Sequence, residues 1–146
     1  MRFAIVVSRF NPTITSGLLR GAEAELDALG ITGESIDVFY TAGAFELPVV
    51  AQRLARSQRY AGVICLGAVI KGDTAHFEYI STGTALGLMQ AMLQTDTPIS
   101  FGVLTTYNEE QALVRSNMDA HNKGREAAAA CVCTARLLID IDRRDA

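Results

Sequence analysis

The 146-residue sequence is poor in the residues on which metal centres, disulfide frameworks and polyanion-binding surfaces depend. It has no Trp, two His, three Cys and a net charge of −3. The His residues lie far apart and the Cys residues fall inside apolar segments, so we expect no metal site. The odd number of Cys predicts buried thiols in a reducing compartment, the cytoplasm, and no disulfides; these residues are Cys65, Cys131 and Cys133. The slightly acidic balance gives no basic field, so we expect no nucleic-acid partner.

Several sequence patterns are also absent. No apolar run reaches the ~18 residues of a membrane span, and no charged region followed by an apolar stretch marks a signal peptide. There is no Walker pattern, and no G-x-G-x-x-G follows the first strand, which disfavours hydrolysis of nucleoside triphosphates and dinucleotide binding. No Ser stands on a G-x-S-x-G turn, so a Ser-His-Asp hydrolase is equally unsupported. We therefore expect neither a membrane partner nor these three activities.

Apolar residues are abundant, at 49% of the chain. The length suits one domain, which we expect to span residues 1–146. Because a small domain has a large surface area relative to its interior volume, some of these apolar residues are expected to lie against other subunits.

Strand-like segments alternate with helix-like segments along the chain. Short β-branched apolar runs predict four strands, at residues 2–8, 35–41, within 60–70, and at 98–105. Strands separated by helices form right-handed βαβ crossovers. The sequence therefore predicts an α/β fold, a four-stranded parallel sheet flanked by helices.

The predicted helices are marked by apolar spacing and by terminal residues. Asn11-Pro12 is expected to cap and start the first helix, and Gly30 to stop it. Thr106 and Glu109 stand at capping-box spacing before a short helix. The remaining helices are predicted through Leu47 and Leu54, from about residue 76 to 94, and from about residue 122 to 140.

The segments after the predicted strands suit a polar ring compound and an anion, because ligands bind beyond the carboxyl ends of parallel strands. Phe10 could stack on a planar heterocycle or pack on its own helix. Glu46 could accept hydrogen bonds from hydroxyls, or simply compensate the dipole of the helix that it begins. Lys71-Gly72-Asp73-Thr74 could cradle a phosphate or form a capped tight turn. His76 could move protons beside that anion site.

Five stretches, read in order, resemble the lumazine synthase family. They are RFN from Arg9, GAFELP from Gly43, LGAVIKGDTAH from Leu66, FGVLTT from Phe101 and NKG from Asn122. The resemblance implies a flavodoxin-like three-layer sandwich. It also implies condensation of 5-amino-6-(D-ribitylamino)uracil with 3,4-dihydroxy-2-butanone 4-phosphate, giving 6,7-dimethyl-8-ribityllumazine, phosphate and water without a metal or redox cofactor.

The same resemblance implies roles for individual residues. Phe10 would stack on the pyrimidine and His76 would move a proton. Ribityl and pyrimidine contacts would come from Ala44, Phe45, Glu46, Ala68, Val69 and Ile70, and the butanone phosphate would be held at Asp73 and Thr74. A neighbouring subunit would supply Phe101, Arg115 and Lys123, with Arg115 gripping phosphate. The implied assembly is a homopentamer or a 60-subunit shell. Phe101 fits this arrangement, because it lies near the start of its predicted strand, away from the carboxyl end.

The sequence departs from the family pattern in places. Lys71 stands where Arg is commoner, Ala68 replaces a frequent Thr, and residues 118–121 lack a typical basic residue and gain an acidic one. Family members also usually carry further residues before the first strand, which pack on a neighbour. Two alternatives stay open: a flavin- or lumazine-binding module, and a shell-forming protein without turnover. Retention of Phe10, Glu46, His76 and Arg115 argues against the second.

Overall fold

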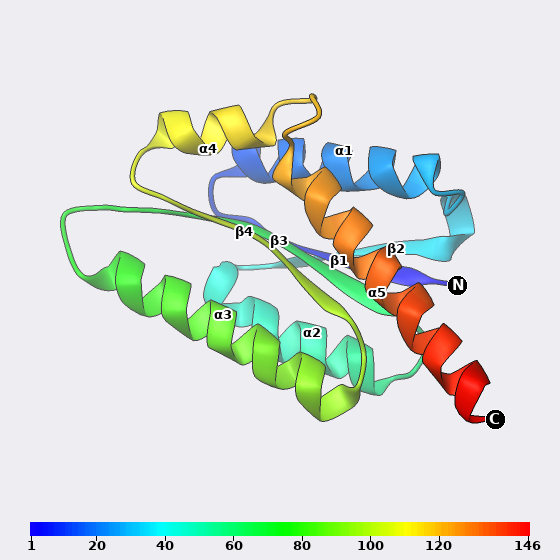
Figure 1. Ribbon diagram of the computed structural model, residues 1–146. Coiled ribbons are helices and arrows are strands. Elements are labelled where there is room, and N and C mark those ends of the chain that lie inside the picture. Colours follow the sequence, from blue (N-terminus) through cyan, green and yellow to red (C-terminus); the bar gives the residue numbers. More distant parts are fainter.

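The computed structural model describes residues 1–146 and places a four-stranded, all-parallel sheet between two layers of helices (Figure 1). The strand order is β2-β1-β3-β4. The strands are β1 (Phe3–Ser8), β2 (Ile36–Thr41), β3 (Gly62–Ile70) and β4 (Ile99–Thr106). One face is covered by α1 (Pro12–Ala28), α4 (Glu109–Ser116) and α5 (Lys123–Asp145), and the other by α2 (Leu47–Arg56) and α3 (His76–Thr95). The α/β fold predicted from the sequence is confirmed.

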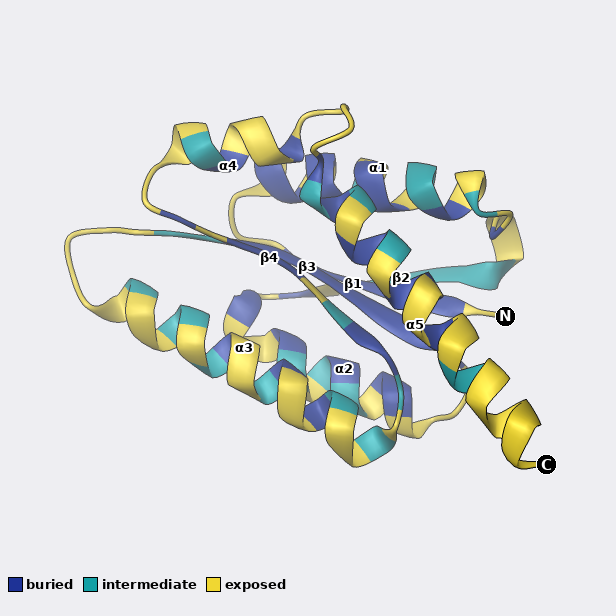
Figure 2. Cartoon of the chain, in the orientation of Figure 1, coloured by how far each residue is buried: buried dark blue, intermediate teal, exposed yellow.

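The sheet divides the core into two apolar clusters, visible as dark residues on both sides of the strands (Figure 2). Side chains alternate along β1, so that Phe3 and Ile5 pack beneath α1 and α5, whereas Ala4 and Val6 pack against α2 and α3. Every residue of β1 is buried. A central parallel strand covered on both faces must be apolar throughout, which is why β1 is a continuous apolar run.

The start of α5 is fixed by a fully buried side chain, Asn122. Its Nδ2 donates to the carbonyl oxygens of Gly17, Ser116 and Asn117 at 2.9–3.1 Å. Its Oδ1 accepts from the first amides of α5, including that of Gly124 at 2.8 Å. A side chain at Gly124 would overlap the carbonyl oxygen of Leu18, so α1 and α5 approach closely there. This cluster sets the position of Lys123.

One expected helix cap is wrong, and another lacks a side-chain hydrogen bond. The short helix α4 is capped by Asn108, whose Oδ1 accepts from Gln111 N at 2.9 Å, and not by Thr106 with Glu109. Thr106 instead completes the pairing of β4 with β3. Helix α1 begins at Pro12 with Asn11 at the N-cap position, as expected, but Asn11 has a left-handed backbone (φ 56°) and its side chain makes no capping hydrogen bond.

The prediction of three buried thiols is wrong for Cys133, which is exposed. Cys131 lies on the face of α5 that packs against the sheet. Two residues along an α-helix is a rotation of about 200°, so Cys133 faces the opposite side.

A polar cluster ties the amino ends of the strands together. Arg2 Nη2 donates to Asp37 Oδ2 at 2.6 Å, and Tyr60 Oη donates to the same oxygen at 2.8 Å. These hydrogen bonds hold the pKa of Asp37 below its ordinary value, and the bond from Arg2 has the largest effect.

We expect this cluster to make stability depend on pH. A lowered pKa in the folded state adds stability above the unfolded pKa of about 3.9, and this stability is lost as pH falls through the folded value. The Tm of the wild type should therefore exceed that of Asp37→Asn at pH 7, and the two should converge below about pH 4. Thermal unfolding followed by circular dichroism across this range measures the gap. A gap that stays constant with pH would contradict the assignment.

Candidate active site

A cavity of about 430 Å³ lies at the carboxyl ends of the neighbouring strands β1 and β3. Chain connections leave these two strands in opposite directions, and such a switch point is the usual ligand site in an open α/β sheet. The lining residues come from the segments after β1 and β2, from the end of β3 and from the first turns of α3; they are Phe10, Asn11, Gly43, Ala44, Phe45, Glu46, Ala68, Val69, Ile70, His76 and Ile80.

Phe10 stands at the cavity mouth with 68% of its surface exposed. A Cβ added at Gly43 would lie 3.2 Å from its ring, a tight contact, so the ring packs closely against the loop after β2. The neighbouring Asn11 donates from Nδ2 to the carbonyl oxygen of Ala68 at 3.2 Å. This bond joins the Phe10 loop to the end of β3. An exposed aromatic ring at the mouth of a cavity is placed to stack on a flat ligand.

The segment after β2 is held from beneath by two hydroxyls. Thr41 Oγ1 donates to the carbonyl oxygen of Gly43 at 2.9 Å, and the fully buried Thr84 donates to that of Ala44 at 3.3 Å. They fix the short helical turn η2 (Ala44–Glu46), which leaves Phe45 and Glu46 exposed to the cavity. Glu46 forms no ion pair. Its carboxylate is therefore available to a polar ligand.

His76 begins α3 at the cavity wall. Its backbone N–H donates to Thr74 Oγ1 at 3.4 Å, which draws the end of the β3–α3 loop against the helix. Asp73 and Thr74 are exposed in that loop and do not line the cavity itself. They lie at its rim by chain connectivity, directly before His76.

Three of the predicted site residues lie elsewhere. Phe101, Arg115 and Lys123 line a groove of about 270 Å³ along β4, the edge strand of the sheet. Arg115 makes no ion pair, and its Nη1 donates only to the carbonyl oxygen of Gln111 at 3.0 Å. Lys123 Nζ, in contrast, lies 2.8 Å from a carboxylate oxygen of Glu126, so an anion would compete with that partner. None of the three lines the cavity at Phe10.

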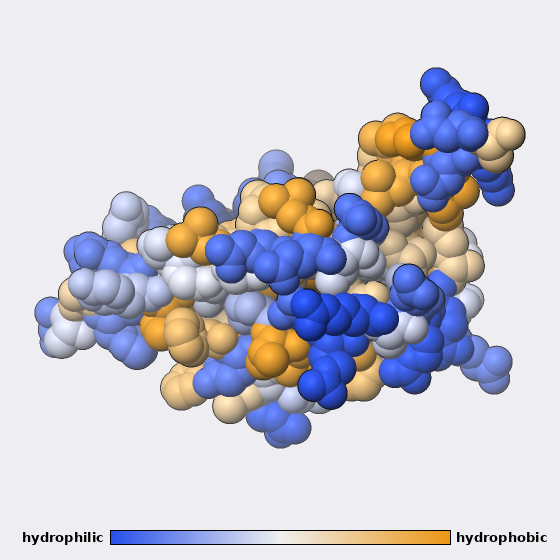
Figure 3. Space-filling view, turned by 90° about the horizontal axis from the view of Figure 1, so that it is seen from below, coloured by the Kyte–Doolittle hydropathy of each residue, from blue (hydrophilic) through white to orange (hydrophobic).

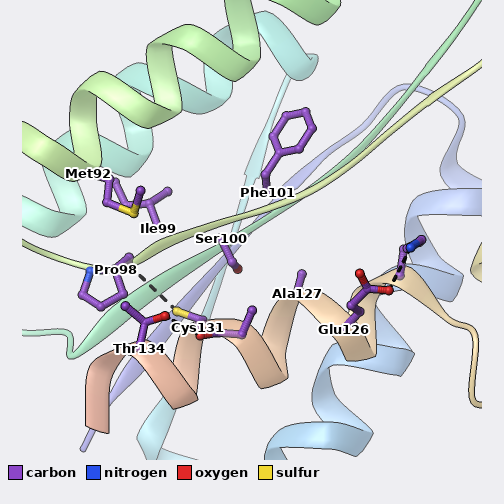
Figure 4. Close-up of a pocket in the computed structure, with 11 residues that line it drawn as sticks. Met92, Pro98, Ile99, Ser100, Phe101, Glu126, Ala127, Cys131 and Thr134 are labelled. Carbon is purple, nitrogen blue, oxygen red and sulfur yellow. Dashed lines mark hydrogen bonds and ion pairs between the residues drawn. The ribbon is translucent and has the colours of Figure 1, made fainter. Parts of the chain in front are cut away.

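A second hollow of about 290 Å³ adjoins this groove, between β4 and α5 (Figure 4). Phe101 points away from α5, whereas Ser100 points towards Cys131 on that helix. Burial raises the pKa of Cys131 to about 12, and burial also raises the pKa of Cys65 far above its ordinary range. Both groups stay protonated thiols at neutral pH and are poor nucleophiles.

Apolar side chains also remain exposed over the α2–α3 layer, which Figure 3 shows from below as patches among polar atoms. They include Val49, Leu86, Met89 and Leu93. None of the helices is long and apolar enough to pass through a lipid bilayer. His, Cys, Asp and Glu side chains nowhere gather in threes that could hold a metal ion.

The sheet order and the cavity at its switch point define an α/β protein of flavodoxin-like architecture with a site for a small molecule. The family described as 6,7-dimethyl-8-ribityllumazine synthase matches residues 1–138. The protein named 6,7-dimethyl-8-ribityllumazine synthase 1 from Caulobacter vibrioides is 62% identical over 94% of this chain and 90% of its own length. Proteins with the same family name from Syntrophus aciditrophicus and Deinococcus radiodurans are 51% and 46% identical, over 97% and 98% of this chain and 92% of each relative. The chain belongs to the 6,7-dimethyl-8-ribityllumazine synthase family, which confirms the resemblance seen in its motifs.

Proposed function

We propose that the chain is a transferase of riboflavin biosynthesis. It condenses 5-amino-6-(D-ribitylamino)uracil with 3,4-dihydroxy-2-butanone 4-phosphate to 6,7-dimethyl-8-ribityllumazine and releases phosphate. The observation that carries this proposal is the cavity at the switch point, which joins an exposed aromatic ring, the end of β3 beyond its pairing with β1 and a His in a chain of this family. The proposed reaction uses no metal and no redox cofactor.

The cavity suits the ribitylaminouracil. Phe10 stacks on the pyrimidine ring. The end of β3, at Ala68, Val69 and Ile70, offers backbone donors and acceptors to the polar edge of that ring. The turn from Ala44 to Glu46 receives the ribityl chain, with the Glu46 carboxylate accepting from its hydroxyls.

The phosphate substrate binds at the rim. Asp73 and Thr74 lie in the loop before α3, whose N-terminus favours a negative charge. Arg115, which has no carboxylate partner, supplies a bidentate fork to the phosphate. Lys123 adds a point charge once a phosphate displaces Glu126.

Arg115, Lys123 and Phe101 reach the cavity from a second copy of the chain. They line the β4 groove, apart from the cavity at Phe10, so one chain presents two halves of a site on different surfaces. Head-to-tail contacts between such surfaces close into a ring. The ring that we propose is a homopentamer, and pentamers that associate further would form a 60-subunit shell. The exposed apolar residues of α3 are available for these contacts.

Catalysis on this surface is mostly positioning. The 5-amino group attacks the ketone and water leaves to give a Schiff base. Removal of a proton from the hydroxyl-bearing carbon then expels phosphate, and the resulting enol becomes a ketone. The ribitylamino nitrogen attacks that ketone and a second water leaves, which closes the second ring. Holding the two substrates in a reactive arrangement contributes several kcal/mol, about 7–11 at the upper limit. His76 adds proton transfer at the cavity wall, worth about 10²-fold or less because the amine and the ketone are already reactive. We place the reaction in the cytoplasm, a reducing compartment that suits three unpaired thiols.

The direct test is to mix the purified chain with both substrates and follow lumazine absorbance together with released phosphate. Equal amounts of lumazine and phosphate, formed in proportion to the amount of protein, support the proposal. Binding of the uracil without product would favour the flavin- or lumazine-binding module instead. If the chain shows neither binding nor turnover, the shell-forming protein is the alternative that remains.

Phe10→Ala tests the ring-binding half of the site. Loss of stacking worth about 1–3 kcal/mol should raise KM for the ribitylaminouracil by about 10-fold or more. KM for the butanone phosphate should change little, since that substrate binds at the rim. Phe10→Tyr keeps the ring and serves as the matched control. An unchanged KM for the uracil would remove Phe10 from the proposed site.

A further inference from the structure

Three side chains from different loops pack together beside the proposed phosphate site. Lys71 Nζ lies 5.9 Å from the centre of the Tyr107 ring. The Phe77 ring packs on the same Tyr at 6.2 Å between centroids, with the ring planes tilted by 43°. Lys71 and Phe77 bracket the loop that carries Asp73 and Thr74 and ends at His76. Tyr107 belongs to the β4–α4 connection and therefore touches both ends of that loop.

The loop itself has few other anchors. Residues 71–76 are all exposed, and a Cβ added at Gly72 would meet nothing within 4 Å. The backbone is held at its start by Lys71 N, which donates to the carbonyl oxygen of Thr106 at 2.9 Å, and at its end by the bond between His76 N and Thr74 Oγ1. Between these points the backbone amides of residues 72–75 donate no hydrogen bond.

Tyr107, by contrast, stands on a rigid base. Its backbone N–H donates to Gln111 Oε1 at 2.9 Å, and the next residue, Asn108, caps α4 through Gln111 N. Thr106 Oγ1 also donates to the carbonyl oxygen of Asn108 at 2.9 Å. The backbone that carries the ring is thus held by β4 and α4, while the loop that the ring touches makes few hydrogen bonds of its own.

We propose that Tyr107 is a positioning residue that sets the conformation of the β3–α3 loop for the phosphate substrate. This inference rests on the proposed function, because it deepens the role of the same site. The aromatic face attracts the Lys71 ammonium and the ring packs on Phe77, so both ends of the loop are drawn to one point. Tyr107 touches no substrate; it acts through Lys71 and Phe77. The phenolic hydroxyl makes no hydrogen bond in the structure, so the ring alone carries the effect.

The test compares Tyr107→Ala with Tyr107→Phe. Tyr107→Ala is expected to raise KM for the butanone phosphate about threefold to tenfold, the scale of one or two exposed aromatic contacts. KM for the ribitylaminouracil should stay unchanged, and Tyr107→Phe should behave as wild type. Tyr79→Ala is the matched control, since Tyr79 is exposed on α3 and makes no aromatic contact. A loss in both KM values together, or a Tyr107→Phe variant as impaired as Tyr107→Ala, would overturn the proposal.

Amide hydrogen exchange of Lys71 and His76, the two amides of this loop that donate hydrogen bonds, supplies a readout that needs no turnover. The Tyr107→Ala variant should exchange these amides several-fold faster than wild type, with the core amides of β1 and β3 unchanged. If wild type fails to form lumazine while exchange in the loop still rises, the proposed function fails and the positioning role stands. If wild type is active and exchange does not change, the positioning role is wrong and the proposed function stands.

Discussion

Replacing Arg115 with Ala is expected to raise KM for the butanone phosphate by about 10- to 100-fold, with KM for the ribitylaminouracil nearly unchanged. A hydrogen bond to a charged group is worth about 1.5–3 kcal/mol, and each 1.4 kcal/mol corresponds to about 10-fold. Arg115 forms no ion pair that phosphate must first break, so its pairing with phosphate contributes its full free energy to binding in the wild type. The Ala variant loses all of that contribution. Steady-state kinetics with each substrate varied in turn measures the two constants.

Arg115→Lys separates charge from geometry in the same experiment. Lys keeps the positive charge but loses the planar fork, so KM for the phosphate substrate should fall between wild type and Arg115→Ala. The side chain is exposed on α4 and bonds only to a carbonyl of its own helix, so the Tm of both variants should stay close to that of wild type. If Arg115→Ala leaves both kinetic constants intact, the phosphate role of Arg115 is wrong.

The fold was accessible from the sequence because its local signals agree with one another. Continuous apolar runs such as β1 mark strands buried on both faces, and helical apolar spacing fills the intervals between them. The errors lie where the sequence offers two residues for one task. Thr106 and Asn108 can each cap a helix; pairing of Thr106 with Ile70 in the sheet decides for Asn108, and spacing alone does not reveal this.

The candidate site was less accessible, because its residues are distributed over two surfaces. Motifs after β1, β2 and β3 converge at one cavity, as parallel topology requires. The position of Phe101 near the start of β4 already indicated a separate surface, and the structure places it in the β4 groove with Arg115. Asn11 was missed as a cavity residue, since its side chain bonds to Ala68 and does not cap α1. Its left-handed backbone has no signature beyond the tolerance of Asn for that conformation.

The separation of the two surfaces leads to the second large expected effect, recovery of activity in mixed rings. Phe10→Ala damages one half of the site and Arg115→Ala the other. When the two variants are unfolded, mixed in equal amounts and refolded together, a site built from two neighbouring chains has four equally frequent compositions. About one site in four then takes Phe10 from one chain and Arg115 from the next, with neither residue replaced. Activity should therefore rise towards a quarter of the wild-type value, well above either variant alone.

A second pair of variants makes this result specific to a shared site. Phe10 and Glu46 line the same cavity of one chain, so a mixture of Phe10→Ala with Glu46→Ala leaves every site with one replaced residue. That mixture should show only the average of its two parents, whereas the pair with Arg115→Ala should exceed its own average. Light scattering on each refolded sample establishes that rings have formed. If the pair with Arg115→Ala also gives only the average, or if a fully active monomer is observed, Arg115 does not act across the boundary between two chains. The Arg115 guanidinium in the β4 groove would then need an anionic partner within its own chain, and the structure places that groove apart from the cavity at Phe10.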